Sequence, residues 1–321
     1  MTIRKMLLRK ELSKDVAQQI EHAHDFVEQI EVERGIQLEH CDDVYTIIIP
    51  EEILHDKPIV LIGGFSQGVH AYAGELFDFY HKGYVTVFVN PIYGYTGPLS
   101  EMHAQFQGTY TVPDVVLRKV FALDALLDQL DANQYHLVGH SQGGMLATHV
   151  AALHAKHVPT LTLVNPEGFQ KDQDTFLIAA KFAHQAFDQM TDIAGQVLRG
   201  DTQLLEPSGR AGRTFMRNFA QKSIWRLTDE VPEGIKADVG TLLLYLKSTP
   251  VRVTLLSGHS DRLFTPREYH EYLLRDHGNG GGDLFALIDA WASFVREGAG
   301  HTALGIERPG VLRQIIEADA H

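Results

Sequence analysis

The stretch that decides the fold is residues 134–153, Gln-Tyr-His-Leu-Val-Gly-His-Ser-Gln-Gly-Gly-Met-Leu-Ala-Thr-His-Val-Ala-Ala-Leu. Its first part, 135–138, is a short apolar run that predicts a buried strand, and its last part, 145–153, is Ala-rich and predicts a buried helix. Between them stands a G-x-S-x-G pattern at 139–143. A strand, this pattern and a helix in direct succession predict a nucleophile elbow, the sharp turn that presents a reactive serine.

The elbow gives each residue of the pattern a role. We expect Ser141 to adopt a strained backbone conformation with its Oγ above the edge of the sheet, and such a tight turn requires small residues at Gly139 and Gly143. The backbone N–H of Gln142 would begin the helix, where partial positive charge favours an oxyanion. Because the same pattern also occurs in Gly-rich turns without chemistry, the rest of the chain must supply a base, an acid and a second oxyanion donor.

Size and charge restrict the class of protein. The 321 residues suffice for one large α/β domain or two smaller ones, and 44% hydrophobic with 21% charged residues is ordinary for a globular chain. The net charge of −13 argues against nucleic-acid binding through a basic surface. The single cysteine, Cys41, excludes an intramolecular disulfide. The sequence contains no recognisable signal peptide and no 18-residue apolar run, so we expect a cytoplasmic location and no membrane span.

The histidines do not form a metal-binding pattern. Two pairs, His22 with His24 and His154 with His157, have suitable spacing but lack a third ligand at a recognisable distance along the chain. The sequence therefore predicts no metal site, and the chemistry of a reactive serine requires no organic cofactor.

The predicted elements divide the chain into three parts. Residues 1–35 predict a helical N-terminal extension, a candidate contact for a homodimer. Residues 36–166 and 248–321 alternate between strands and helices, which predicts a mostly parallel sheet flanked by helices. Residues 167–247 predict helices alone and are interpreted as a helical cap inserted into the core. The predicted strands lie within 36–49 and at 57–62, 84–90, 135–138, 159–164, 251–257 and 291–297. The predicted helices include 70–81, 113–130, 145–153, 174–199, 211–226, 239–247, 267–276 and 309–319.

Three chemically suited residues follow predicted strands in the order Ser141, Asp261, His301, which is the order expected for this kind of elbow. A serine hydroxyl is a poor nucleophile without a general base, and imidazole, with an ordinary pKa of about 6.5, suits that role. His301 would take the proton of Ser141, and Asp261 would fix the tautomer of His301. His140 is rejected as the base because its position beside Ser141 should direct its side chain elsewhere.

Other residues compete for the role of the acid. Glu167 follows the strand at 159–164, so its carboxylate could reach the same histidine. His259 and Asp283 are weaker rivals for the acid and base positions. The acid therefore remains open between Asp261 and Glu167 at the level of sequence.

A second oxyanion donor is predicted after the strand at 57–62, where Gly63-Gly64-Phe65 stands. A glycine pair directly after a central strand lets the backbone approach a ligand closely. We expect the N–H of Phe65 to face the oxyanion together with that of Gln142, and one such donor is typically worth ~3 kcal/mol of barrier. The alternative is a plain strand-to-helix turn.

Four motifs together resemble the α/β-hydrolase fold superfamily, and within it a serine esterase or lipase with a helical cap. They are Gly63-Gly64-Phe65, Gly139-His140-Ser141-Gln142-Gly143-Gly144, Gly258-His259-Ser260-Asp261 with Pro266, and Gly298-Ala299-Gly300-His301 with Glu307-Arg308-Pro309. The resemblance covers residues 58–316 and implies an eight-stranded, mostly parallel sheet and a serine hydrolase. The chain departs from many relatives, which have His-Gly in place of Gly63-Gly64 and an acidic-Arg-Gly loop in place of residues 90–95, so we expect a different pocket mouth.

The candidate substrate-binding residues surround the predicted elbow and include aromatic side chains from three segments. They are Gly64, Ser66, Tyr93, Tyr95, His140, Phe169 and Phe264. The Phe and Met content of residues 167–247 fits a small-molecule ester with an apolar acyl or alcohol part. The same aromatic residues could instead pack the cap onto the core.

Acyl transfer to water is the leading interpretation of these patterns, with an ester as substrate and an acyl-enzyme on Ser141. The same triad could hydrolyse an amide or a C–C bond or carry out perhydrolysis, because the fold and the triad do not fix the reaction. A ligand-binding protein without catalysis on the same scaffold is the third interpretation, and it would predict a damaged triad.

Overall fold

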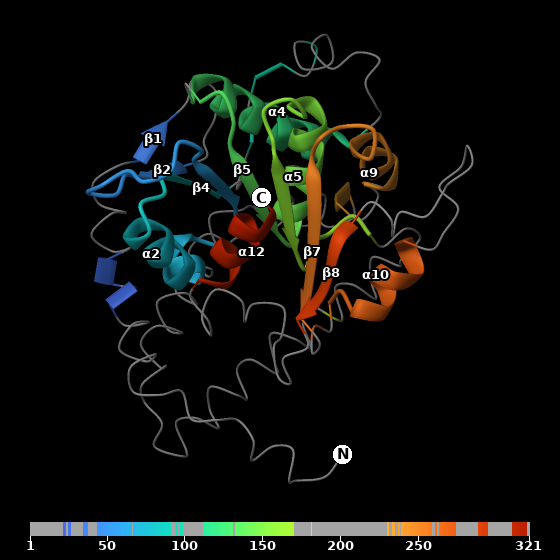
Figure 1. Ribbon diagram of the computed structural model, residues 1–321. Helices are drawn as coiled ribbons and strands as arrows, with labels where there is room; N and C mark the ends of the chain where they lie inside the picture. Colours follow the sequence, from blue (N-terminus) through green and yellow to red (C-terminus); the bar gives the residue numbers. More distant parts are fainter. Residues whose placement is uncertain are drawn as a thin grey trace, which may run out of the picture.

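The computed structural model is an α/β structure whose central sheet carries helices on both faces (Figure 1). The structure describes residues 22–23, 25–26, 35–37, 44–65, 67–90, 94–95, 97–98, 100, 112–130, 132–169, 181, 230, 233–234, 237, 239–258, 261, 263–273, 288–294 and 310–319.

Within the described residues, the sheet is mixed and has eight strands in the order β1-β2-β4-β3-β5-β6-β7-β8. The strands are β1 Gly35–Gln37, β2 Val44–Ile48, β3 Ile59–Ile62, β4 Thr86–Asn90, β5 His136–His140, β6 Thr160–Val164, β7 Arg252–Gly258 and β8 Ile288–Phe294. β1 and β2 pair antiparallel at one edge, and β2 is antiparallel to β4. All remaining neighbours from β4 to β8 are parallel.

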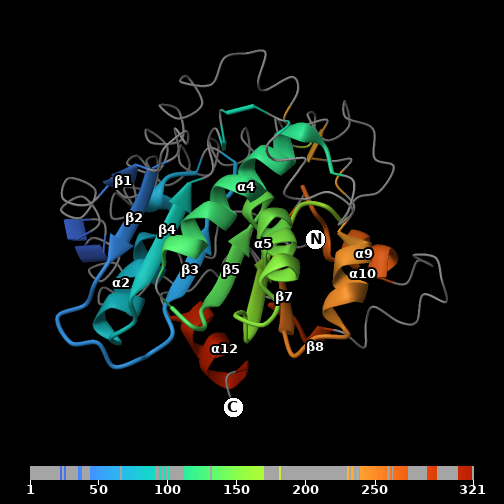
Figure 2. The ribbon, with the colours of Figure 1, turned by 90° about the horizontal axis from the view of Figure 1, so that it is seen from above.

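The helices cover the sheet on two faces, and Figure 2 shows α5 lying between α4 and α9. The helical elements are η2 Val69–Tyr72, α2 Ala73–His81, α4 Asp114–Gln129, α5 Gln142–Leu153, α9 Gly240–Leu246, α10 Pro266–Leu273 and α12 Val311–Asp319. Side chains alternate between the two faces along each strand. In β3, Val60 and Ile62 pack with α4 and α5, whereas Ile59 and Leu61 pack with α2 and α12.

Most predicted elements within the described residues are confirmed, with differences at their ends. β5 continues two residues past the predicted strand, and α5 begins directly after the serine, because the glycines that follow it lie inside the helix. The segment predicted as one helix at 70–81 begins with the 3₁₀ turn η2. The last strand, predicted at 291–297, begins earlier, at Ile288, since the apolar run before it continues across Asp289, and residues 295–297 lie outside the described residues.

The predicted cap and N-terminal extension are largely outside the described residues. The helix predicted at 239–247 is confirmed as α9. The helices predicted at 174–199 and 211–226 lie outside the described residues apart from Lys181, which is helical. Of the N-terminal extension, the described residues 22–23 and 25–26 are helical, and Phe26 contacts the rings of Phe77 and Tyr80 on α2.

Candidate active site

The strand order creates a place where ligands gather. From β3 the chain moves to β4 on one side, and then crosses over to β5 on the other side of β3. In open α/β sheets, ligands bind outside the carboxyl ends of the strands at such a switch point. Two of the predicted site segments, Gly63-Gly64 after β3 and Ser141 after β5, lie at this edge.

Ser141 adopts the strained turn that the sequence predicts. It has φ 55° and ψ −122°, and it is one of two described non-glycine residues with positive φ. Its N–H donates to Val164 O at 2.9 Å, and its carbonyl accepts from Gly144 N and Glu167 N, each at 2.9 Å. These three backbone bonds tie the turn to β6 and to the start of α5. They hold a conformation that costs roughly 1–3 kcal/mol for a residue with a side chain.

The glycines around Ser141 are required by close backbone packing. A Cβ on Gly143 would lie 2.6 Å from Gly63 O and closer still to Ile62 O, both backbone atoms of the β3 end. A Cβ on Gly139 would lie 2.7 Å from the Cβ of Ala147 in α5. The strand, the turn and the helix therefore pack as closely as the nucleophile elbow requires.

A polar network holds the loop after β3 against the elbow. Gly64 N–H donates to Tyr72 Oη at 2.8 Å, and Tyr72 O–H donates to Gln67 Oε1 at 2.5 Å. His140 Nδ1 lies 2.7 Å from Tyr72 Oη and 2.8 Å from Gln67 Oε1. Gln67 Oε1 can only accept a hydrogen bond, and the hydroxyl proton of Tyr72 is already donated to it. The proton between His140 Nδ1 and these two oxygens is therefore carried by His140 Nδ1. Burial raises the pKa of Tyr72 well above its usual value, so the phenol stays neutral.

This network explains two of the predicted residues. A Cβ on Gly64 would lie 3.1 Å from the Cβ of Ser141 and 3.2 Å from His140 Nδ1, so the glycine allows the loop to reach the elbow. His140 directs Nδ1 toward the loop after β3, which agrees with its rejection as the base. Tyr72 and Gln67 were not identified from the sequence. No local pattern indicates that the hydroxyl of Tyr72 accepts from the backbone of Gly64, eight residues earlier.

A buried charged group contacts the residue that follows the nucleophile. Lys119 of α4 is 1% exposed, and its Nζ donates to Gln142 Oε1 at 2.8 Å. The same Nζ forms an ion pair with Glu230, which is 2% exposed and comes from the segment between β6 and β7. Sequence reasoning missed both residues. The position of Lys119 could have indicated its burial, because it lies three residues after Val116 and four before Leu123, on the apolar face of the helix.

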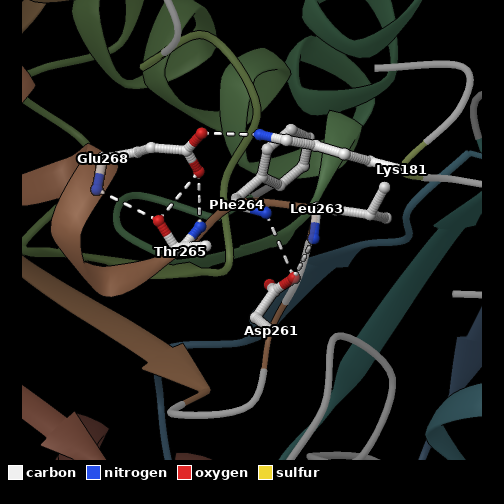
Figure 3. Close-up of polar contacts among 6 residues, drawn as sticks. All are labelled: Lys181, Asp261, Leu263, Phe264, Thr265 and Glu268. Carbon is white, nitrogen blue, oxygen red and sulfur yellow. Dashed lines mark hydrogen bonds and ion pairs between the residues drawn. The ribbon is translucent and has the colours of Figure 1, made fainter. Parts of the chain in front are cut away.

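Asp261 lies just beyond β7 with its carboxylate held by the backbone (Figure 3). Its Oδ1 accepts from Leu263 N at 2.8 Å and from Phe264 N at 3.1 Å, and its own N–H donates to Gly258 O at 3.0 Å. The residue is 2% exposed. These bonds to one carboxylate oxygen fix the direction of the side chain, as the orienting acid of a triad requires.

The loop that follows Asp261 ends in a capping box at the start of α10. Thr265 N–H donates to Glu268 Oε2 at 2.7 Å, and Glu268 N–H donates to Thr265 Oγ1 at 3.3 Å, so each side chain satisfies the backbone of the other. Glu268 Oε1 also accepts from Lys181 Nζ at 2.6 Å, and Figure 3 shows this contact above the loop. The segment after β6 is thereby joined to the loop that carries Asp261.

The rival acid, Glu167, lies in a different environment from Asp261. Glu167 is half-buried, and a Cβ on Gly234 would lie 2.5 Å from its Oε1, so its carboxylate faces the segment between β6 and β7. Burial first, and then the charges of Asp261, Glu268 and Glu167, raise the pKa of Tyr269 well above its usual value. Both candidate acids therefore lie in electrostatic reach of one tyrosine, whose O–H donates to Pro166 O at 3.1 Å.

Asn165 joins the two strand ends from which these acids project. It has φ 42° and is fully buried, and its Oδ1 accepts from Gly258 N at 2.7 Å. Its N–H donates to Leu256 O at 2.8 Å. The end of β6 and the end of β7 are thus fixed to each other immediately before Glu167 and Asp261.

The three described aromatic candidates for the pocket, Tyr95, Phe169 and Phe264, are buried. Phe169 is 1% exposed and contacts the rings of Tyr269 and Tyr272 at centroid distances of 5.5 and 5.1 Å. Tyr95 packs on Phe121 of α4 at 4.6 Å, and Phe264 is buried in the same core cluster. Their roles in substrate binding stay predictions. Ser66, Tyr93, His301 and the rivals His259 and Asp283 lie outside the described residues.

Two general features complete the description of the site. Within the part of the chain that the structure describes, no three His, Cys, Asp or Glu side chains gather as a set of metal ligands. No described helix is long and apolar enough to span a bilayer.

The arrangement of sheet, elbow and acid loop defines a class of protein, and comparison with known families agrees. A family model described as alpha/beta hydrolase fold matches residues 57–275, which is more than half of the chain. The protein belongs to the α/β-hydrolase fold family. No curated protein sequence matches the chain.

Solved structures with the same fold include lipases and esterases. A putative lipase from Acinetobacter baumannii AYE is similar with a TM-score of 0.57 at 15% identity, over 97% of this chain and 96% of that one. A bacterial membrane phospholipase A is similar with a TM-score of 0.58 at 15% identity, over 96% and 92% of the two chains. A structure from work on carboxylesterases of the thaumarchaeon Nitrososphaera gargenis gives 0.54 at 15% identity, over 89% and 97%. At these identities the likeness establishes the fold.

Proposed function

We propose that the protein is a serine hydrolase that cleaves a carboxylic ester with an apolar acyl or alcohol part. Ser141 attacks the ester carbonyl, His301 takes the serine proton and returns it to the leaving alcohol, and Asp261 orients His301. Water then hydrolyses the acyl-enzyme by the same proton transfers in reverse. The observation that carries the proposal is the backbone of Ser141, a residue with a side chain held at φ 55° between a buried strand and a buried helix. Strain of this kind is found where a side chain must be presented for chemistry.

The oxyanion would be held by the N–H groups of Phe65 and Gln142. Gln142 is the first residue of α5, so its N–H stands at the positive end of that helix. In the loop after β3, the N–H of Gly64 is bonded to Tyr72, which holds the backbone of the loop immediately before Phe65. Lipases and carboxylesterases among the proteins of the same fold support an ester as the substrate.

Labelling by a fluorophosphonate, followed by intact-protein mass, tests the proposal. One adduct on the wild type is expected, absent in Ser141→Ala and slowed at least 100-fold in His301→Ala, because the serine then lacks its base. Hydrolysis of p-nitrophenyl butyrate should be lost in the same two variants. If Ser141→Ala kept wild-type esterase activity, the proposal would be wrong.

The choice of acid is tested in the same assay. Asp261→Asn is expected to lower kcat by about 10³–10⁴-fold, since the amide favours the wrong tautomer of His301. Glu167→Gln is the matched variant and should keep kcat within about threefold. The reverse pattern would assign the role of the acid to Glu167.

A further inference from the structure

We propose that Lys119 and Glu230 are positioning residues for the oxyanion site, because together they hold Gln142 and make its placement depend on the segment between β6 and β7. The inference rests on the proposed function, in which the N–H of Gln142 binds the oxyanion. It assigns a role to a buried ion pair that the triad does not use.

Lys119 holds the side-chain amide of Gln142 in one orientation. The ammonium group of Lys119 can only donate, so the Gln142 atom that faces it at 2.8 Å is the carbonyl oxygen. This bond fixes which way the amide is turned. Gln142 is 3% exposed and is the first residue of α5, directly after the strained Ser141. A side chain fixed at this position also restrains the backbone N–H of the same residue.

Burying the charges of Lys119 and Glu230 is unfavourable in free energy. Lys119 lies on the apolar face of α4 and is 1% exposed, where an unpaired ammonium would be strongly unfavourable. Glu230, itself 2% exposed, supplies the opposite charge. Buried ion pairs are often no more stabilising than apolar side chains of similar size. A pair of this kind beside the nucleophile, with a third contact to the oxyanion residue, is therefore better explained by what it positions than by the stability it adds.

The three contacting residues come from three different segments of the chain. Lys119 belongs to the helix before β5, Gln142 begins the helix after β5, and Glu230 belongs to the segment between β6 and β7. The ion pair thus connects that segment to the elbow itself. Since a shift of about 1 Å at a reacting group can lower the rate about 100-fold, loss of the contact should be visible in kcat.

The test separates positioning from stability. The variants are Lys119→Met, Glu230→Gln and the double variant, each assayed for kcat and KM with p-nitrophenyl butyrate, for the fluorophosphonate labelling rate and for unfolding in urea. Lys119→Met alone leaves the Glu230 carboxylate buried without its cation and should be destabilised. The double variant removes both charges and should recover most of that stability. Its kcat should stay about 10–100-fold below wild type, with KM within about threefold, because Gln142 still lacks its donor.

A matched control uses the same two helices. His154 of α5 lies 2.6 Å from Asp124 of α4 in a second, partly buried pair that does not contact Gln142. Asp124→Asn should lower stability and leave kcat unchanged. Gln142→Leu should lower kcat as the double variant does. Adding it to the double variant should cause little further loss, because Lys119→Met has already removed the contact that Gln142→Leu removes.

Hydrogen exchange gives a readout that does not depend on turnover. Exchange in the peptide that covers residues 139–146 should be faster in the double variant than in wild type and unchanged in Asp124→Asn. A double variant with wild-type kcat and wild-type exchange would overturn the inference. If wild type is neither labelled nor active while the exchange difference is present, the proposed function fails and the positioning of Gln142 by Lys119 stands.

Discussion

Ser141 and the glycines beside it are held by contacts between backbone atoms. The serine N–H and carbonyl bond to residues of β6, α5 and the loop after β6, and Gly143 packs on the carbonyl oxygens at the end of β3. Because backbone atoms cannot move aside as a flexible side chain can, this part of the site tolerates little change in volume.

Gly143→Ala is accordingly expected to destabilise the fold. Alanine would gain about 1 kcal/mol in helix propensity, but its Cβ would overlap the carbonyl oxygens of Ile62 and Gly63. Overpacking against backbone should cost about 2–4 kcal/mol in the free energy of unfolding, measured with urea. The matched control is Gly63→Ala, whose Cβ would meet the ring of Phe88 at 3.2 Å and Gln67 O at 3.3 Å and should cost much less. Equal losses in the two variants would contradict this account.

The hydroxyl of Tyr72 holds the loop after β3 and can be removed by a single substitution. Tyr72→Phe removes the acceptor of Gly64 N–H and the contacts to Gln67 and His140, and an unsatisfied buried N–H costs about 1–3 kcal/mol. The loop after β3 should loosen, so kcat should fall about tenfold with a smaller change in KM. Tyr84→Phe is the control, since that hydroxyl contacts Glu317 on α12. Unchanged kcat in Tyr72→Phe would show that this network does not position the oxyanion loop.

At the scale of elements, the start of α10 determines how the acid loop is held. Thr265 and Glu268 cap the helix reciprocally, and Glu268 also binds Lys181 (Figure 3). Glu268→Ala should therefore lower the free energy of unfolding by about 1–2 kcal/mol. It should also lower kcat, because Asp261 is four residues before the cap. Glu271→Ala breaks an exposed pair with Arg267 on the same helix and should change stability by less than about 0.5 kcal/mol. A similar effect of both variants in urea unfolding would refute the role of the cap.

The same elements show what the sequence could predict. The parallel strands and the elbow are visible because their evidence is local: an apolar run, then glycines at fixed spacing around Ser141. The network around Gly64 and the pair of Lys119 with Glu230 are not local. Lys119 and Gln142 are 23 residues apart, and only the packing of α4 on α5 brings them together. Tyr72 and Glu230 belong to no sequence pattern from which their hydrogen-bond or ion-pair partners could be predicted.

Across the whole molecule, a buried carboxylate joins the last described helix, α12, to α2. Glu75 of α2 is fully buried, and its Oε2 accepts from Gly310 N at 3.1 Å, at the start of α12. The N–H groups of Val311 and Leu312 also stabilise its charge. Asp78 of α2 binds Arg313 at 2.7 Å beside it. α12 follows the predicted position of His301 in the chain. It is bound to α2 by these hydrogen bonds and this ion pair (Figure 1).

Glu75 makes the stability of the fold depend on pH. Burial, with the charge of Asp78 as the second cause, raises the pKa of Glu75 from 4.5 to about 8. The folded state therefore binds more protons than the unfolded state between these values, so stability falls as pH rises toward 8. Burial lowers the pKa of His136 and of His149 from 6.5 to about 4, which gives the opposite slope below pH 6.5. Because the histidines of the unfolded chain are still half protonated at pH 6.5, the contribution of Glu75 between pH 6.5 and 8 is obtained as the difference in slope between wild type and Glu75→Gln.

In that window the free energy of unfolding of the wild type should fall with pH by up to about 1.4 kcal/mol per unit from this group. Glu75→Gln cannot ionise, so this fall should be absent from the variant, which keeps only the opposite slope of the two histidines near pH 6.5. Urea unfolding at pH 6.5, 7.0, 7.5 and 8.0 measures it, and Glu51→Gln, which removes one exposed carboxylate, should keep the wild-type slope. Parallel curves for wild type and Glu75→Gln would mean that the carboxylate is already ionised at pH 6.5. The N–H groups of Gly310, Val311 and Leu312 would then outweigh its burial, and the attachment of α12 to α2 would be ionic over the whole range.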